Sequence, residues 1–206
     1  MTVEEIVAME WSMFDQVQNI GGRASCQEDS ATFSIMRSSQ VRAWSPEMRE
    51  SYGRDLRDAL HCGRNLLSEK YGCMMERTSP LEFERIKDRL PRRSPEKQGL
   101  IDQICRVHVD WMKQATLDYP CLAGRGRAME RHEDTPYTTS FETYLWGELA
   151  TYSLETLERY WEHIQQLQRE GRNLNEEILM YTATQYGYAT LEEAETSLSG
   201  RTGEKQ

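Results

Sequence analysis

The amino-acid sequence predicts an all-α protein. Apolar residues recur at the 3.6-residue spacing of helices in successive segments, and glycines or Ser-Pro pairs stand at the boundaries between these segments. No segment shows the alternation and hairpin turns that are typical of strands. The length of 206 residues suits a single compact domain. We expect one helical domain over residues 1–198 with about seven to nine helices, a long irregular loop at about 121–139, and a disordered tail over 199–206.

Composition excludes several classes of protein. The net charge of −9 argues against a DNA-binding or general nucleic-acid-binding protein. No apolar run approaches the roughly 18 residues that cross a bilayer, and the start of the chain, with Glu4 and Glu5, is unlike a secretory signal. The five cysteines are irregularly spaced and form no Cys-x-x-Cys pair, which indicates free thiols in a reducing compartment and no metal site. We expect a cytoplasmic protein that contacts no membrane.

The first helix is expected over residues 3–19, where apolar residues recur at helical spacing. Glu10 lies on or beside the apolar face of this helix, and a carboxylate that faces inward needs a partner. Two interpretations stay open. Glu10 is either a boundary residue with its tip in water or a buried ligand of Arg23 or Arg37.

Gly21 and Gly22 end the first helix, and a second helix is expected directly after them. Ser25 and Glu28 fit the capping box Ser-x-x-Glu, which makes Cys26 the first helical residue. A thiol at a helix N-terminus tends to have a lowered pKa and to be more reactive. The junction is therefore either a site for a nucleophile, an anion or a polarised carbonyl group, or a well-formed turn with a small buried cysteine.

Serine–proline pairs mark the starts of three helices in the middle of the chain. Ser45-Pro46, Ser79-Pro80 and Ser94-Pro95 each place a capping residue before a proline at the first helical position. His108 lies in the apolar stripe of the helix after Ser94, as is typical of a satisfied core histidine. The most basic stretch is either a solvated face or a contact for a phosphate backbone. Its basic residues are Arg85, Lys87, Arg89, Arg92, Arg93 and Lys97.

A long helix is expected over residues 140–171. Spacing by four places Tyr144, Glu148 and Tyr152 on one face, where tyrosine hydroxyls can orient a carboxylate and transfer protons. Alternatively, the tyrosines pack by their rings and extend their hydroxyls to water. Gly147 within a helix costs about 1 kcal/mol relative to alanine, which indicates close approach of another backbone or a ligand. The last helices are expected over residues 173–186 and, as a short helix, from Thr190.

A set of short motifs extends over residues 4 to about 195. The motifs are Gly21-Gly22-Arg23-Ala24-Ser25-Cys26-Gln27, Arg37-Ser38-Ser39-Gln40, Ser51-Tyr52 with Asp55-Leu56, Gly63-Arg64-Asn65-Leu66, Glu69-Lys70-Tyr71, Tyr119-Pro120, Ser140-Phe141-Glu142-Thr143-Tyr144-Leu145, Gly147-Glu148-Leu149, Thr151-Tyr152-Ser153 and Tyr186-Gly187-Tyr188. In their combined spacing they resemble DUF4125, a family defined as a domain of unknown function. One departure is Gly72-Cys73, where the family pattern has Ala-Arg, so any role of an arginine there is absent or moved.

Fungal members of this group resemble arginine-containing cyclodipeptide synthases, which form a cyclo-arginyl dipeptide from aminoacyl-tRNAs. The resemblance implies arginyl-tRNA and a second aminoacyl-tRNA as partners and, because both esters are already activated, no cofactor. Catalytic candidates are Cys26 as the nucleophile, then Ser39 and Ser140, with Tyr144, Glu148 and Tyr152 as proton carriers. Substrate-binding candidates are the acidic residues Glu10, Asp29, Glu69, Glu142 and Glu148, the arginines Arg23 and Arg37, and Gln27, Gln40 and Tyr71. The basic stretch from Arg85 to Lys97 is the candidate tRNA contact.

A competing hypothesis is a non-catalytic helical domain that holds a small cationic ligand or a partner. Clustering of the tyrosines, the cysteine and the arginines in one water-accessible cleft favours the enzyme, whereas scattering over separate surfaces favours the binding domain. A metal-dependent helical oxidase is disfavoured, because the chain has four histidines and no Glu-x-x-His pair on an expected core helix.

Overall fold

Ten α-helices and three short 3-10 helices form the part of the chain that the computed structural model describes, residues 1–18, 22–124, 126–135 and 137–203. The expected all-α class is confirmed, and the only β-type pairing in this part is an isolated bridge between Thr135 and Thr138. No described helix has the length and apolar character of a membrane-spanning segment. The helices are α1 (Val3–Asp15), α2 (Ser30–Arg42), α3 (Pro46–His61), α4 (Leu66–Thr78), α5 (Pro80–Phe83), α6 (Pro95–Asp118), α7 (Phe141–Leu149), α8 (Leu154–Glu170), α9 (Leu174–Gln185) and α10 (Leu191–Gly203).

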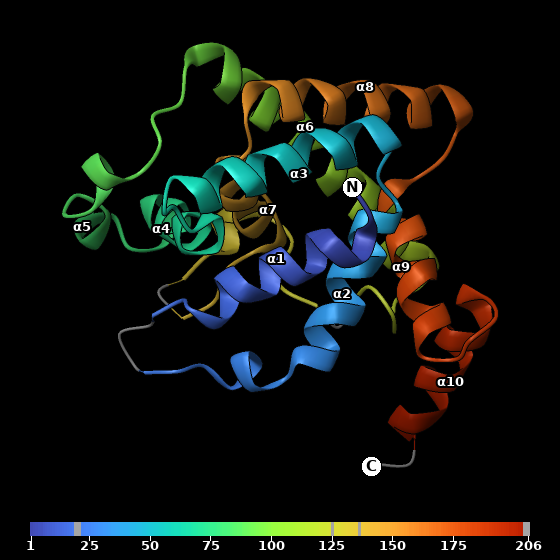
Figure 1. Cartoon of the computed structure of the whole chain (residues 1–206). Coiled ribbons are helices and arrows are strands. Elements are labelled where there is room, and N and C mark those ends of the chain that lie inside the picture. The colour runs from blue at the N-terminus through green and yellow to red at the C-terminus, as the bar shows by residue number, and fades with distance from the viewer. Residues whose placement is uncertain (19–21, 125, 136, 204–206) are drawn as a thin grey trace.

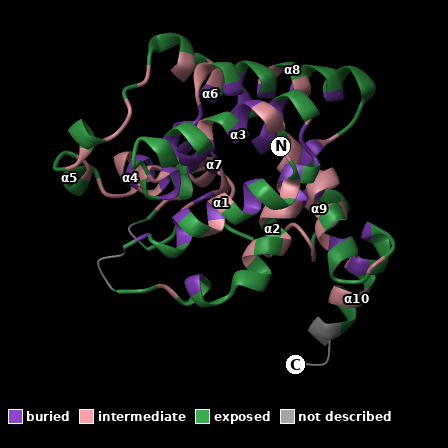
Figure 2. Ribbon diagram, in the orientation of Figure 1, coloured by how far each residue is buried: buried purple, intermediate pink, exposed green. Residues whose placement is uncertain are grey.

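The helices surround one continuous apolar core. In Figure 1, α3 and α8 lie side by side along one edge, α1 and α2 pack together at the opposite side, and α7 lies between them near α4. The faces that these helices turn toward one another are buried, as Figure 2 shows. The rings of Trp44, Tyr52, Tyr152 and Tyr160 lie in edge-on or tilted contacts within this core. The packing therefore brings α1, α2, α3, α4 and α7 around a common interior.

Local capping signals predicted several helix starts correctly. The side chains of Ser45 and Ser94 accept hydrogen bonds from backbone N–H groups three residues later, and Asn173 caps α9. Ser79 makes no such bond, and the helix after it, α5, is only four residues long. A proline at the first position therefore marked the start of α5, but the expected cap by the Ser79 side chain is wrong.

The expected helix start at Cys26 is also wrong. Residues Ser25–Glu28 form a 3-10 helix, and α2 begins later, with Asp29 accepting a hydrogen bond from the Thr32 N–H. Arg23 pairs with Glu28, so this carboxylate does not complete a capping box with Ser25. Cys26 is exposed within this turn and is not the first residue of an α-helix.

The expected helix over residues 140–171 is divided into α7 and α8. Ser153 caps α8 by accepting a hydrogen bond from the Thr156 N–H, and its own N–H donates to Asp55. Tyr152 consequently lies between the two helices. Gly171 ends α8 with a φ of 67°, in the left-handed region that favours glycine.

Gly147 is where α7 approaches α4. A Cβ built on Gly147 would lie 3.0 Å from the Lys70 carbonyl oxygen and 2.4 Å from the Cγ of Met74. The expected close approach is therefore confirmed, and the approaching groups are the Met74 side chain and the Lys70 backbone carbonyl of α4. This contact fixes the position of Lys70 relative to α7.

The remaining expectations concern helix ends and the long loop. Helix α1 ends at Asp15, four residues before the expected end. Residues 121–139 are largely irregular, as expected, apart from a 3-10 helix at Arg131–Glu133. Helix α10 extends to Gly203, so residues 199–203 are helical and not a disordered tail, while 204–206 lie outside the described residues. It packs on α9 through a small separate apolar cluster that includes Leu191 and Ala194.

His108 is a satisfied core residue, as expected. Its Nδ1 lies 2.7 Å from Oδ1 of Asn175, and its Nε2 lies 2.8 Å from the Tyr160 hydroxyl. Burial lowers the pKa of His108 to about 4.

Candidate functional site

Four charged side chains from four helices meet in the interior. Glu10 comes from α1, Arg37 from α2, Lys70 from α4 and Glu148 from α7, and each is at least nine-tenths buried apart from a small exposed part of Arg37. The two cations balance the two carboxylates. We call this group of four residues the buried ionic cluster.

Arg37 joins the two carboxylates of the cluster. Its Nε donates to Oε2 of Glu10 at 2.8 Å and its Nη2 donates to Oε1, which makes the contact bidentate. Its Nη1 donates to Oε1 of Glu148 at 3.0 Å and to the side-chain oxygen of Gln40 at 2.6 Å. The Tyr52 hydroxyl also donates to Oε1 of Glu10, at 2.7 Å. Of the two partners expected for a buried Glu10, the structure therefore has Arg37.

Glu148 is the most heavily bonded carboxylate of the cluster. Its Oε1 accepts hydrogen bonds from Arg37, from Gln40 Nε2 at 3.1 Å and from the Tyr152 hydroxyl at 2.8 Å. Its Oε2 accepts a bond from Lys70 Nζ at 2.6 Å. Burial alone would raise the pKa of Glu148, but the charges of Arg37 and Lys70 hold it well below its usual range. Glu148 is therefore ionised at neutral pH and is bonded at both oxygens.

The two tyrosines that touch these carboxylates are neutral hydrogen-bond donors. Burial raises the pKa of Tyr52 and of Tyr152 well above the ordinary value, and the neighbouring carboxylates Glu10 and Glu148 raise it further. Their hydroxyls therefore orient the carboxylates. This arrangement suits a positioning role for Glu148 and Tyr152 more than a proton shuttle.

A pocket of about 260 Å³ adjoins the cluster. Arg37 and Lys70 belong both to the cluster and to the lining of this pocket, whereas Glu10 and Glu148 do not line it. The pocket thus has cationic groups at its inner end and aromatic walls. Its lining residues are Phe14, Cys26, Asp29, Thr32, Phe33, Met36, Arg37, Leu67, Lys70, Tyr71, Arg127 and Tyr144.

Tyr144 occupies one wall of the pocket beside two cations. Lys70 Nζ lies 3.5 Å from the centroid of its ring, and the guanidinium carbon of Arg127 lies 4.5 Å from the same centroid. The charge of Lys70 lowers the pKa of Tyr144, although burial and Glu148 act in the opposite direction. Burial and the neighbouring Tyr144 raise the pKa of Tyr71.

Several expected site residues come together at this pocket or directly behind it. Cys26, Asp29, Tyr71 and Tyr144 line it, and Arg37 connects it to the buried cluster. The residues behind it are Glu10, Gln40, Glu148 and Tyr152.

Two expected acidic ligands are bonded elsewhere. Glu69 forms a two-bond ion pair with Arg64, at 2.8 and 2.6 Å. Glu142 accepts a bond from the Arg131 N–H and lies 3.8 Å from Arg77. Neither lines the pocket, so the acidic pool expected around a cationic substrate is reduced there to Asp29.

The expected serine nucleophiles have structural roles. The buried Ser39 hydroxyl donates to the Ile35 carbonyl oxygen and accepts from Gln185 of α9. Ser140 is the N-cap of α7. Neither serine lines the pocket.

Gln27, expected to bind substrate, also has a structural role. It is buried, and its amide donates to backbone oxygens at the end of α1. It does not line the pocket.

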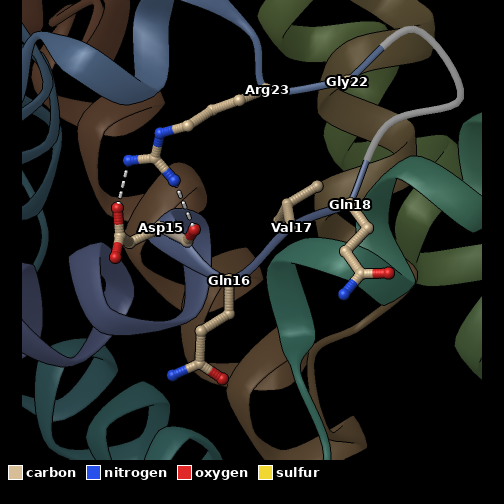
Figure 3. Close-up of a pocket in the computed structure, with 6 residues that line it drawn as sticks. All are labelled: Asp15, Gln16, Val17, Gln18, Gly22 and Arg23. Carbon is tan, nitrogen blue, oxygen red and sulfur yellow. Dashed lines mark hydrogen bonds and ion pairs between the residues drawn. The ribbon is translucent and has the colours of Figure 1, made fainter.

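Arg23 lies at a different, more open pocket of about 600 Å³ at the end of α1. Figure 3 shows its guanidinium extending toward Asp15, with which it forms an ion pair. It also pairs with Glu28 and donates to the Gln27 carbonyl oxygen. Arg23 is therefore separated from the buried cluster and has its own partners.

The six basic residues of the expected tRNA contact divide into two groups. Arg93 pairs with Glu76 and stacks over the Trp146 ring, and Lys97 donates to the Ala150 carbonyl oxygen at 2.8 Å. The others are exposed: Lys87 pairs with Glu84, and Arg85, Arg89 and Arg92 have no ion pair within the described residues. Lys87, Arg92 and Arg93 also line a groove of about 430 Å³ beside the start of α6.

Lys70 and Arg127 are the site residues that sequence reasoning missed. Lys70 is four residues from both Leu66 and Met74, which places it within the buried stripe of α4. A lysine in such a stripe needs a carboxylate partner, so this spacing was a usable signal. No comparable pattern marks Arg127, which lies in the irregular segment after α6.

Comparison with known proteins identifies the family of this chain. No curated protein and no solved structure matches the chain. Among the described residues, no group of three or more histidine, cysteine or acidic side chains could hold a metal ion. The family described as protein of unknown function, DUF4125, matches residues 1–196. Because this match covers nearly the whole sequence, the chain belongs to the DUF4125 family.

Proposed function

We propose that this protein is an arginine-containing cyclodipeptide synthase of the cytoplasm. It would join the aminoacyl groups of arginyl-tRNA and a second aminoacyl-tRNA into a cyclo-Arg-Xaa diketopiperazine. The observation that carries the proposal is the 260 Å³ pocket, in whose lining a thiol, two tyrosines and two buried cations come together. The resemblance of the motifs to the fungal enzymes supplies the reaction.

The chemistry requires positioning and proton transfer. The amine of one aminoacyl-tRNA attacks the ester carbonyl of the other, a C–N bond forms, the ester C–O bond breaks, and the tRNA 3′-oxygen takes a proton. The free amine of the dipeptidyl ester then attacks the remaining ester carbonyl in the same way and closes the ring. Both esters are activated in advance, so the reaction as proposed consumes no ATP.

Arg37 and Lys70 are suited to stabilise the oxyanion that forms in each step. Their charges are balanced by carboxylates that do not line the pocket, so the substrate meets two fixed positive charges on side chains that are already desolvated. Fixed charges of this kind lower the barrier because they need little reorganisation as negative charge develops.

Asp29 is suited to bind the guanidinium of the arginyl group. It is the only carboxylate among the described residues that line this pocket. Its hydrogen bond from the Thr32 N–H lowers its pKa, which keeps it ionised at neutral pH. A carboxylate can bind a guanidinium through two parallel hydrogen bonds.

Cys26 is the candidate nucleophile for a covalent aminoacyl-enzyme. It is exposed and lines the same pocket as Tyr71. If the thiol carries the first aminoacyl group, Cys26→Ala abolishes both the product and a covalent adduct seen in intact-mass measurements. Full activity of Cys26→Ala with no adduct would leave direct transfer between the two tRNAs as the mechanism.

The exposed basic residues Arg85, Lys87, Arg89 and Arg92 are the proposed tRNA contact. Phosphate contacts of this kind weaken as salt concentration rises. Arg93 and Lys97 are used in internal contacts and are left out of this surface.

A product assay tests the proposed function. The protein is incubated with arginine, the other amino acids, tRNA, aminoacyl-tRNA synthetases and ATP, and products are identified by mass spectrometry. We expect a cyclo-arginyl dipeptide that disappears after ribonuclease treatment. Asp29→Asn should reduce it, and Glu155→Gln, which alters an exposed ion pair with Arg54, is the matched control. Absence of the product from folded protein refutes the proposal.

The competing proposal is a non-catalytic domain that binds a small cationic ligand. The complete internal pairing of Glu10 and Glu148 favours it, because neither buried carboxylate is free to act as a base. Binding of arginine amide that depends on Asp29, in protein that forms no cyclodipeptide, would support this second function.

A further inference from the structure

Lys70 lies between two side chains of α7. Tyr144 and Glu148 are four residues apart, so they project from the same side of that helix. Lys70 Nζ donates to Glu148 at 2.6 Å and lies 3.5 Å from the centroid of the Tyr144 ring. Gly147 permits this arrangement, because a Cβ there would press against the Lys70 carbonyl oxygen and the Met74 side chain.

The lysine is held in place by its ion pair with Glu148. Its side chain is 3% exposed and its carboxylate partner Glu148 is ionised. The pocket-lining tyrosine therefore faces a buried lysine that is bonded to Glu148. The same interaction distinguishes Tyr144 from Tyr152, whose hydroxyl is buried against Glu148 and does not line the pocket.

Charged and titratable groups surround Tyr144 from each neighbouring element. Helix α4 contributes Lys70 and Tyr71, α2 contributes Arg37, the segment after α6 contributes Arg127, and α7 itself contributes Glu148. The carboxylate opposes ionisation of the phenol and the nearby cations favour it. The direction of the pKa shift is downward, with Lys70 as its largest cause.

We propose that Tyr144 is the proton-transfer residue of this pocket and that Lys70, held by Glu148, is the positioning residue that allows it to accept a proton. The substrate part of this inference rests on the proposed function. The phenolate of Tyr144 accepts a proton from the amine as the C–N bond forms. The phenol then donates that proton to the tRNA 3′-oxygen as the ester C–O bond breaks, so Tyr144 ends each transfer as it began. Tyr71 lines the same pocket beside Tyr144 and supplies its second phenolic hydroxyl.

Titration of the tyrosines tests the electrostatic part without any substrate. Ultraviolet difference absorbance of tyrosinate is followed against pH in the intact protein. We expect one tyrosine to ionise below the ordinary pKa of about 10. This early titration should be lost in Tyr144→Phe and should remain in Tyr137→Phe, which changes a fully exposed tyrosine.

A charge-balanced variant tests the role of the lysine. Lys70→Met with Glu148→Gln removes one cation and one anion together, so that the Glu10–Arg37 pair keeps its balance. The early titration should move to higher pH in this double variant and should persist in Lys70→Arg. Circular dichroism establishes that each variant is folded before it is titrated. An early titration that survives in Tyr144→Phe, or that is unchanged in the double variant, overturns the proposal.

Kinetics separate this inference from the proposed function. Tyr144→Phe should lower the rate of cyclodipeptide formation about 100-fold or more while leaving substrate KM largely unchanged. The double variant should shift the rising limb of the rate–pH profile to higher pH. An undiminished rate in Tyr144→Phe overturns the proposal even if its titration is as expected. Suppose that the native protein forms no cyclodipeptide but Tyr144 ionises early in dependence on Lys70. The proposed reaction then fails, and the electrostatic coupling of Lys70 to Tyr144 stands.

Discussion

The charge balance of the buried ionic cluster predicts that a double variant is more stable than either of its single variants. Glu148→Gln keeps the shape of the side chain and removes its charge. Glu10 is then the remaining carboxylate of the cluster, and it is bonded to Arg37, whereas the ion pair of Lys70 was with Glu148. Lys70 is left buried without a counter-ion. Breaking a buried ion pair on one side costs about 3–5 kcal/mol, which is a large part of the roughly 5–15 kcal/mol that stabilises a typical protein.

Replacing Lys70 together with Glu148 restores the charge balance of the cluster. Lys70→Met alone should destabilise by a similar amount, because it leaves Glu148 with one cation in place of two. Lys70→Met combined with Glu148→Gln leaves Glu10 and Arg37 as a matched pair that also contacts Tyr52. The double variant should therefore be more stable than either single variant, although it carries both changes.

Urea unfolding followed by circular dichroism at pH 7 measures these differences. With a slope of about 2 kcal/mol per molar urea, each single variant should lower the unfolding midpoint by about 2 M. Glu155→Gln, which breaks the exposed pair with Arg54, should lower the free energy of unfolding by less than about 1 kcal/mol. Single variants that lose less than about 1 kcal/mol, or a double variant that loses the sum of both, would refute the reasoning.

Three further predictions concern His108, Gly147 and Ser153. Burial lowers the pKa of His108 to about 4, so the unfolded state, with a pKa of about 6.5, binds more protons between these values. The contribution of neutral His108 to the free energy of unfolding is complete above pH 6.5 and falls by about 3 kcal/mol toward pH 4. This pH dependence should be absent from the stability–pH curve of His108→Gln. Gly147→Ala should destabilise by about 1–3 kcal/mol because its methyl group meets Met74 and the Lys70 carbonyl oxygen, despite the better helix propensity of alanine; equal stability in urea would contradict this. Ser153→Ala should cost about 1 kcal/mol through loss of the α8 cap, and an unchanged melting temperature would count against the division of α7 from α8.

The helix starts that sequence reasoning found are those determined by neighbouring residues. Ser45 and Ser94 cap helices whose first residue is a proline, and both interactions lie within three residues of the chain. The expected start at Cys26 failed because the deciding contacts join this turn to the end of α1. Arg23 binds Asp15 as well as Glu28, and Gln27 donates to the Phe14 carbonyl oxygen of α1.

The site was predictable only where the pattern within one helix carries the information. A carboxylate on an apolar helix face requires a partner, which identified Glu10 and offered Arg37 as one of two choices. The pairing of Lys70 with Glu148 joins residues 78 positions apart and depends on how α4 packs against α7. Periodicity identifies which face of each helix is buried, but it does not say which two faces meet.

The buried ionic cluster also constrains how the protein opens. Its charged groups come from α1, α2, α4 and α7, and its partner Tyr52 comes from α3, so separation of any one of these helices would expose its partners or leave a buried charge unpaired. We expect the amide protons of these five helices to exchange with solvent only in a common, large-scale opening. Helix α10 touches the rest through α9 and the segment around Cys121, so its amides should exchange in a smaller and more frequent opening. The interior that holds the pocket together is therefore a single cooperative unit, with a more labile C-terminal helix attached to it.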